Sequence, residues 1–182
     1  IKKRLPWLLI LLGLGLVVSS VVGLFESVIE QLTIIIFFQS LILDMAGNVG
    51  TQSLAVTIRV LTDENLSAKQ KLGLVFKESR IGFSNGLILG SMGLALIGFY
   101  VHFVKGGAWG FSFSVSFCIG AAMLLSMLIS SIIGTTVPMF FKKIKVDPAV
   151  ASGPLITTIN DLVAVVTYYG LAWIFLINIM HY

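Results

Sequence analysis

Two aspartates, Asp44 and Asp161, lie deep within long apolar segments of this 182-residue chain. A charged side chain at the centre of a bilayer costs about 2.5–3.5 kcal/mol on insertion scales, so it normally faces a bundle interior or an aqueous path. No Lys or Arg lies in the middle of either segment, and Arg59 would be about 22 Å from Asp44 along a helix. A buried salt bridge is therefore not expected. Each carboxylate must be protonated, hydrogen-bonded by neutral groups or met by a cation from outside the chain.

Small and polar residues recur at helical spacing around each aspartate. In the first segment they are Asp44, Asn48, Thr51 and Ala55, with Gly47, Gly50 and Gln52 beside them. In the second segment they are Pro154, Thr157, Asp161, Ala164 and Tyr168, preceded by Gly153. The glycines also suit close helix packing. Loosened backbone around Asn48, and the carbonyl freed by Pro154, could turn further oxygen atoms toward a cavity.

The donor atoms of these two stripes select the class of ion. Carboxylate, amide, hydroxyl and carbonyl oxygens are hard ligands, whereas His102 and His181 lie near the outer ends and Cys118 stands alone. Zinc, copper and redox chemistry are therefore not expected. A twofold dimer would bring two copies of Asp161 to one axis, which suits Mg²⁺ that keeps several waters, with Mn²⁺ or Ca²⁺ left open.

Five long apolar segments must position these residues. Hydrophobic residues make up 57% of the chain and charged residues only 11%, which excludes a water-soluble globular protein. Since a crossing takes about 20 helical residues, we predict an all-α, multi-pass cell-membrane protein. Residues 1–182 would form a single transmembrane domain with spans at about 5–24, 32–60, 81–104, 109–141 and 149–180. The alternating stretch 111–117 resembles a strand, but an unpaired strand is unstable in lipid, so a helix entry or interfacial segment is expected there.

Basic residues gather on one side of these spans. Eleven of the 12 lie before the first span or in the second and fourth connectors, and only Lys105 lies opposite. The positive-inside rule then places the N-terminus in the cytoplasm and the C-terminus outside. In the cytoplasmic connector 61–80, Ser67 and Gln70 have capping-box spacing and predict a short surface helix. The start at Ile1, with no cleavage site, indicates a domain cut from a longer chain without a signal peptide.

Two long motifs resemble the MgtE family of magnesium channels and transporters. They are Gly-Asn-Val-Gly-Thr-Gln at 47–52 and Asp-Pro-Ala…Gly-Pro…Thr-Thr…Asp at 147–161. The resemblance covers essentially the whole chain and implies a homodimer whose second and fifth spans line a central pore. It implies that Asp161 is the magnesium-selecting carboxylate and that Thr157 supplies a nearby backbone oxygen. With Asp44 and Asn48 as further candidate ligands, the expected pore lining is Gly47, Gly50, Thr51, Gln52, Ala55, Gly153, Pro154, Ala164 and Tyr168.

The same resemblance leaves regulation and one site open. Many relatives carry a cytoplasmic magnesium-sensing region with paired CBS modules, which is absent from these 182 residues. Asp44 is either a second ion site or a protonated structural acid. Membrane lipid and divalent cations are the expected partners beside a second copy of the chain, and no nucleic acid is expected.

Two alternatives to cation permeation come from other classes. Asp44 and Asp161 could form the catalytic dyad of an intramembrane aspartyl protease. They follow Leu43 and Asn160, however, rather than the Tyr and Gly-x-Gly that such proteases carry. A purely structural subunit would leave both acids unexplained. The sequence has neither a Walker A motif for ATP-driven pumping nor a His-Glu-x-x-His motif for metalloprotease chemistry, so no enzyme activity is expected.

Overall fold

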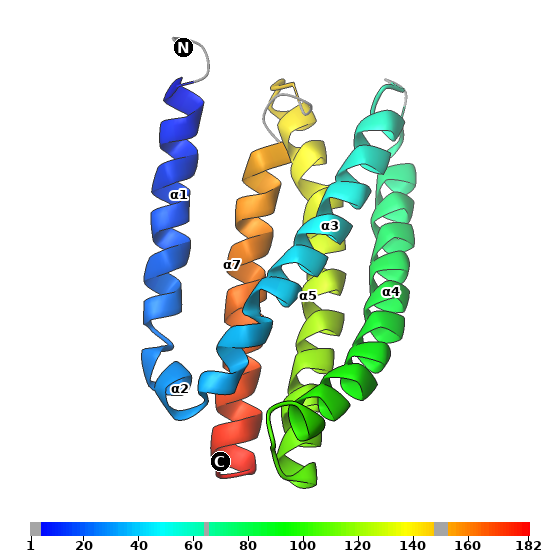
Figure 1. Ribbon diagram of the computed structural model, residues 1–182. Coiled ribbons are helices and arrows are strands. Elements are labelled where there is room, and N and C mark those ends of the chain that lie inside the picture. The colour runs from blue at the N-terminus through cyan, green and yellow to red at the C-terminus, as the bar shows by residue number, and fades with distance from the viewer. Residues whose placement is uncertain (1–4, 64–65, 148–152) are drawn as a thin grey trace.

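The computed structural model describes residues 5–63, 66–147 and 153–182, and these are helical almost throughout (Figure 1). The long helices are α1 (Leu5–Gly23), α3 (Ile36–Val60), α4 (Ala68–Phe103), α5 (Trp109–Lys143) and α7 (Gly153–Leu171). The short elements are α2 (Glu26–Gln31), the 3₁₀ turn η1 (Thr33–Ile35) and the π-helical segment η2 (Ala172–Ile179). No strand occurs in the described ranges, which confirms the all-α prediction.

Five helical segments are long and apolar enough to cross a membrane. They are Leu5–Gly23, Thr33–Val60, Ala68–Phe103, Trp109–Lys143 and Gly153–Ile179. The chain is thus a multi-pass membrane protein. The alternating stretch 111–117 lies inside α5, where the helix satisfies its backbone amides. The predicted start of the last span at 149 lies outside the described residues.

The connector before the third span is shorter than the sequence suggested. The predicted capping box is present: the Ser67 amide donates to Gln70 Oε1 at 2.8 Å, and the Gln70 amide donates to Ser67 Oγ at 3.3 Å. The expected separate surface helix within 61–80 is wrong, however, because α4 continues unbroken for 36 residues. A helix of that length extends about 54 Å, well beyond a hydrocarbon core of about 30 Å. Nothing in its sequence forces a break, since no proline follows the cap.

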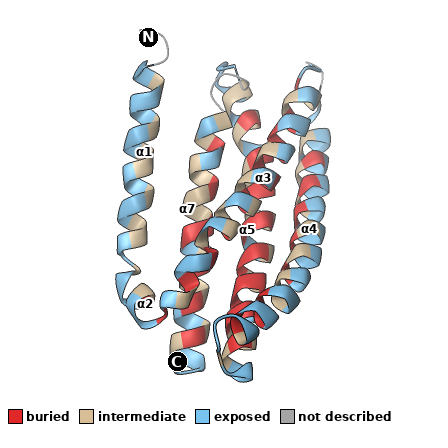
Figure 2. Cartoon of the chain, viewed as in Figure 1, coloured by how far each residue is buried: buried red, intermediate tan, exposed pale blue. Residues whose placement is uncertain are grey.

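A seam of glycines joins α4 to α5. Gly82, Gly86 and Gly90 are buried at one-turn intervals on α4. A Cβ added to Gly90 would lie 2.6 Å from the Gly120 carbonyl oxygen, and one added to Gly120 would lie 2.6 Å from the Gly90 carbonyl oxygen. The two backbones therefore touch, as small residues permit in membrane helices. Figure 2 shows the buried residues running along α5, the central helix of the bundle.

Helix α1 stands at the edge of the bundle. None of its residues is buried, and its packing in the described structure is mainly against α7. Leucines such as Leu8, Leu12 and Leu16 are more than half exposed. Figure 2 shows α1 coloured as exposed or intermediate along its whole length. This helix owes its place to an apolar environment rather than to a buried core of its own.

The beginning of α3 packs tightly on the end of α7, and Figure 1 shows the two helices crossing obliquely. The Tyr168 hydroxyl donates to the Ile35 carbonyl oxygen at 2.8 Å, and the Tyr169 hydroxyl donates to Gln39 Oε1 at 2.5 Å. Both tyrosines are completely buried. Buried phenolic hydroxyls need such partners, and these bonds therefore set how α3 lies on α7.

The glycine seam generates a stability prediction. Replacing Gly90 by Ala should lower the free energy of unfolding by about 1–3 kcal/mol, because the new methyl group overpacks the contact with the Gly120 backbone. Thermal unfolding of the purified protein in detergent measures the effect. The matched control is Gly73→Ala on the same helix, where an added Cβ meets nothing within 4 Å. An equal loss of stability in both variants would contradict the seam.

Candidate cation site

Asp44 on α3 and Asp161 on α7 face one hollow between these helices. Its volume is about 390 Å³. Its lining consists of Ser40, Leu43, Asp44, Gly47, Asn48, Thr51, Thr157 and Asp161. The four predicted ligand residues, Asp44, Asn48, Thr157 and Asp161, thus all line this hollow. Two segments more than a hundred residues apart in sequence contribute to the hollow.

Helical periodicity explains why these residues share the hollow. On α3 the side chains facing it recur every three or four residues from Ser40 to Thr51, and on α7 Thr157 and Asp161 are one turn apart. The opposite face of α3 is buried and contacts the rest of the bundle. Asp44, Asn48 and Thr157 are exposed in the single chain. The hollow therefore opens away from the bundle of its own protomer.

The threonine hydroxyls at the hollow are oriented by their own helices. Thr51 Oγ1 donates to the carbonyl oxygens of Gly47 and Asn48, each at 3.0 Å, and Thr157 Oγ1 donates to the Gly153 carbonyl oxygen at 3.3 Å. A hydroxyl whose proton is used in this way still has lone pairs to offer as an acceptor. Both groups can therefore present oxygen lone pairs to a cation or to its water shell.

The aspartates have no cationic partner in the part of the chain that the structure describes. Neither carboxylate forms an ion pair or a hydrogen bond with a described residue. The described residues also contain no group of three or more His, Cys, Asp or Glu that could hold a metal ion by themselves. One protomer thus supplies two carboxylates and several neutral oxygens, which suits a cation that keeps part of its water shell.

The volume of the hollow fits that description. A water molecule occupies about 30 Å³ in the liquid, so six waters around a small ion need about 180 Å³. The hollow of about 390 Å³ exceeds this requirement. The hollow is therefore large enough for an ion that keeps several of its waters.

Several residues of the predicted pore lining lie elsewhere in the protomer. Ala164 and Tyr168 are completely buried, because η1 and the beginning of α3 cover that part of the α7 face. Gly50 is buried against the Asn160 side chain and the Gly134 backbone. The structure does not bring these three residues to the hollow. The remaining four do not line it either: Gln52, Ala55 and Pro154 are exposed, and Gly153 is half-buried.

The structure adds a buried acid that the sequence placed near a connector. Glu78 is only 3% exposed, and its Oε2 accepts a hydrogen bond from Ser53 Oγ at 3.0 Å. The expected connector over 61–80 hid this residue, because α4 begins ten residues before it and turns it toward α3. Glu78 lies one helical turn before Gly82, which is also buried, and this spacing was the sequence signal that could have placed Glu78 on the buried face of a helix. Glu78 does not line the hollow of Asp44 and Asp161.

Asn160 is a second residue that sequence reasoning missed. It is completely buried, and its side-chain nitrogen and oxygen have no hydrogen-bond partner among the described residues. It directly precedes Asp161 on α7, so the two side chains point to different sides of the helix. Asp161 lines the hollow, while Asn160 packs on Gly50 inside the bundle. An amide inside an apolar segment was the signal that could have found it.

Fold and site together define a polytopic helical membrane protein with an acidic, oxygen-lined hollow in its spanning helices. The family model of MgtE, described as a divalent cation transporter, matches residues 39–171, which include every residue that lines the hollow. The chain belongs to the MgtE family.

Two relatives show the extent of the similarity. The chain is 37% identical over 174 residues to the magnesium transporter MgtE of Bacillus subtilis, covering 96% of this chain and 37% of that protein. It is 30% identical over 169 residues to the magnesium transporter MgtE of Thermus thermophilus, covering 93% of this chain and 35% of that protein. The chain therefore spans little more than a third of the length of these relatives.

The buried acid outside the hollow gives a second prediction. Glu78→Ala should lower the free energy of unfolding by about 1–3 kcal/mol, because it leaves Ser53 Oγ buried without its acceptor. Glu78→Gln keeps an acceptor oxygen and should lower the free energy of unfolding by a smaller amount. Thermal unfolding in detergent compares them, with the exposed Glu30→Ala as control. Equal stability of Glu78→Ala and Glu30→Ala would show that the contact contributes nothing.

Proposed function

We propose that this chain is the membrane domain of a magnesium channel or transporter. The observation that carries the proposal is the hollow in which Asp44 and Asp161 meet without a cationic partner among the described residues. A cation from outside the chain offsets the cost of holding carboxylates within spanning helices. The relatives named magnesium transporter MgtE support Mg²⁺ as that cation.

The pore of this proposal lies between two copies of the chain. The hollow opens away from its own bundle, and its exposed polar residues would face lipid in an isolated protomer. A twofold axis beside α3 and α7 would cover them and place two copies of each aspartate around one path. Asp161 then acts as the selecting carboxylate, while Asn48, Thr51 and Thr157 present neutral oxygens to the hydrated ion.

Permeation in this proposal is passive. A divalent ion gains about 4.6 kcal/mol when it crosses a membrane potential of 100 mV, since each elementary charge gains about 2.3 kcal/mol. Carboxylates that hold the ion through its waters bind weakly enough to release it again. The potential and the concentration gradient then supply the driving force. Mn²⁺ and Ca²⁺ carry the same charge and are the natural competitors.

The protease alternative makes a different demand on the same hollow. A catalytic dyad requires two carboxylates that share a proton, and a peptide substrate must reach both of them. Membership of a family described as divalent cation transporters argues for permeation instead. Cleavage of a transmembrane peptide that needs both Asp44 and Asp161 would favour the protease.

A flux measurement tests the main proposal. Asp161→Asn should lower Mg²⁺ uptake into proteoliposomes at least tenfold, because the amide cannot balance the charge of the ion. The exposed Glu30→Gln, which removes one acid outside the hollow, should transport like the wild type. Uptake of Mg²⁺, Mn²⁺, Ca²⁺ and Na⁺ is compared in each variant. Selective Mg²⁺ flux at the wild-type rate in Asp161→Asn would refute the assignment.

The role of Asp44 is tested separately by ion binding. We expect Asp44→Ala to weaken the protection that Mg²⁺ gives against thermal unfolding, because the hollow loses one of its two carboxylates. Titration of the melting temperature with Mg²⁺ measures the change, with Asn48→Asp as the variant expected to shift it the other way. Unchanged Mg²⁺ protection and flux in Asp44→Ala would assign this residue a structural role.

A further inference from the structure

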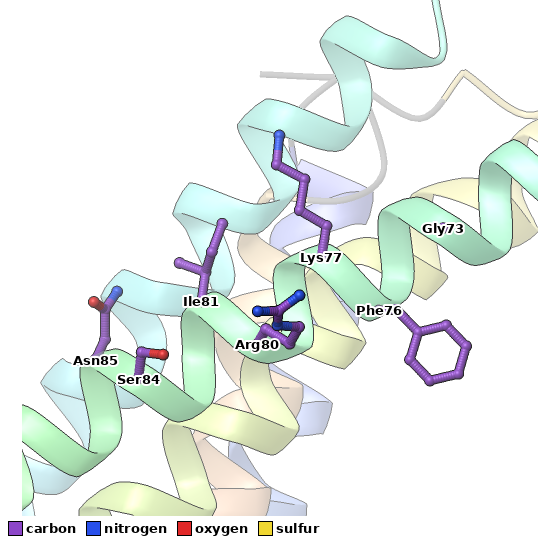
Figure 3. A pocket seen from close by; sticks show the side chains of 7 residues that line it. All are labelled: Gly73, Phe76, Lys77, Arg80, Ile81, Ser84 and Asn85. Carbon is purple, nitrogen blue, oxygen red and sulfur yellow. The ribbon is translucent and has the colours of Figure 1, made fainter.

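A second hollow lies on the outward side of α4, away from the aspartates. Its volume is about 520 Å³, and it is lined by Gly73, Phe76, Lys77, Arg80, Ile81, Ser84 and Asn85. Figure 3 shows Lys77, Arg80, Ser84 and Asn85 following one another along this helix. The function proposed above makes no use of this hollow.

Its charge is positive, and no described residue balances it. Lys77 and Arg80 are both exposed, and neither forms an ion pair or hydrogen bond with a residue in the described ranges. Glu78 lies between them in sequence but points into the bundle, where it accepts the hydrogen bond from Ser53. No acidic residue lines the hollow. An anion is therefore the ligand that its charge favours.

Two polar side chains beside the charges, Ser84 and Asn85, have no hydrogen-bond partner among the described residues. Ser79 and Ser91 on the same helix donate their hydroxyl protons to the carbonyl oxygens of Val75 and Leu87, each at 2.7 Å. Ser84 Oγ and the Asn85 side chain, in contrast, form no hydrogen bond with any described residue. Serine hydroxyls within spans usually bond back to their own helix. The Ser84 hydroxyl and the Asn85 amide of the hollow are therefore available to a ligand.

The depth of the hollow matches the headgroup layer. Arg80 lies 23 positions before Phe103 on α4, or about 35 Å along the helix, against a hydrocarbon core of about 30 Å. At the Phe103 end, His102 and Trp109 stack with ring centroids 3.6 Å apart, as aromatic groups gather at one membrane interface. Arg80 thus falls at the opposite interface. Ser84 and Asn85 lie about 6 Å deeper, below the phosphate level.

Two further cavities follow the hollow along α4 and α5, and together they outline a mainly apolar groove toward the Phe103 end of α4. A neighbouring cavity of about 280 Å³ shares Phe76, Arg80 and Ser84 with it and adds Ser79, Phe83 and Leu128. Another cavity of about 260 Å³ follows along the glycine seam, lined by Gly86, Leu87, Gly90, Ser91, Leu94, Phe117, Gly120, Ala121 and Leu124. Leu94 is about 21 Å from Arg80 along α4, which exceeds half of the hydrocarbon core, about 15 Å. One acyl chain can lie along this groove.

We propose that α4 and α5 hold an anionic phospholipid at the basic end of the bundle. The phosphate contacts Lys77 and Arg80, and Ser84 Oγ and the Asn85 amide donate to the glycerol ester oxygens. One acyl chain follows the groove of the glycine seam. A soluble anion would use the charges but not the apolar groove, whereas a phospholipid matches the order of charge, donor and groove with depth.

Native mass spectrometry of the full-length protein in detergent tests this proposal. Phosphatidylglycerol and phosphatidylcholine with identical acyl chains are titrated, and the apparent Kd of the first bound lipid is measured. We expect phosphatidylglycerol to bind at least tenfold more tightly. The double variant Lys77→Gln/Arg80→Gln should weaken phosphatidylglycerol binding about 30-fold, since each basic residue near an anionic headgroup contributes about a factor of five to the affinity. Phosphatidylcholine binding should change little.

The control removes the same charge from the same helix. Lys69 and Lys71 do not line the hollow, so Lys69→Gln/Lys71→Gln should change the phosphatidylglycerol affinity less than threefold. Ser84→Ala/Asn85→Ala keeps the charge and should give a smaller but measurable loss. Equal losses in the two charge variants, or equal affinity of the wild type for both lipids, would overturn the proposal. Displacement of the lipid by millimolar inorganic phosphate would also overturn it, because the groove would then contribute nothing.

Discussion

The bilayer core offers no water to polar groups, and this constraint determines where each polar side chain of the bundle can lie. Thr51, Thr135 and Thr157 donate their hydroxyl protons to their own helices, whereas a few neutral groups, among them Ser126 and Asn160, are buried without a partner among the described residues. Tyr168 and Tyr169 find acceptors on η1 and α3. Against this background, two carboxylates on one hollow without a described cationic partner demand an ion or a proton from outside. These two acids are charged groups in the described spans for which no cationic partner is present.

The two sides of α3 perform different tasks. Its buried side, with Gly50 and Ser53, packs on α7, α5 and α4 through small residues and one hydrogen bond to Glu78. Its other side, with Asp44 and Asn48, lines the hollow and is exposed in the protomer. Close packing on one side holds the polar side in position. In the proposed function, a rigid backbone of this kind would present oxygens to the ion with little further loss of conformational entropy on binding.

A second close contact in the bundle is the glycine seam between α4 and α5. Backbone contact between Gly90 and Gly120 fixes α4 on α5, and the same small residues leave a groove on the outer surface. Because glycine has no side chain, these residues allow α4 and α5 to pack closely and also leave a groove on the outer surface of the two helices. The basic residues at one end of α4 would repel a cation approaching that end. An anionic lipid bound there would reduce the repulsion.

The sequence alone determined the number and type of spans, because twenty-residue apolar runs have one stable form in lipid. It also identified Asp44 and Asp161, since an unpaired acid inside such a run is visible without coordinates. It misplaced Glu78 in a connector, because a capping box marks where a helix begins but not how far it continues.

Only the tertiary structure decided which members of the two stripes face the hollow. Helical periodicity placed Ala164 and Tyr168 on the face of Asp161, but the beginning of α3 covers that part of α7 and leaves the part with Thr157 open. A one-dimensional pattern specifies which residues share a face. What covers that face depends on how distant helices cross, and contacts between segments far apart in sequence set that crossing.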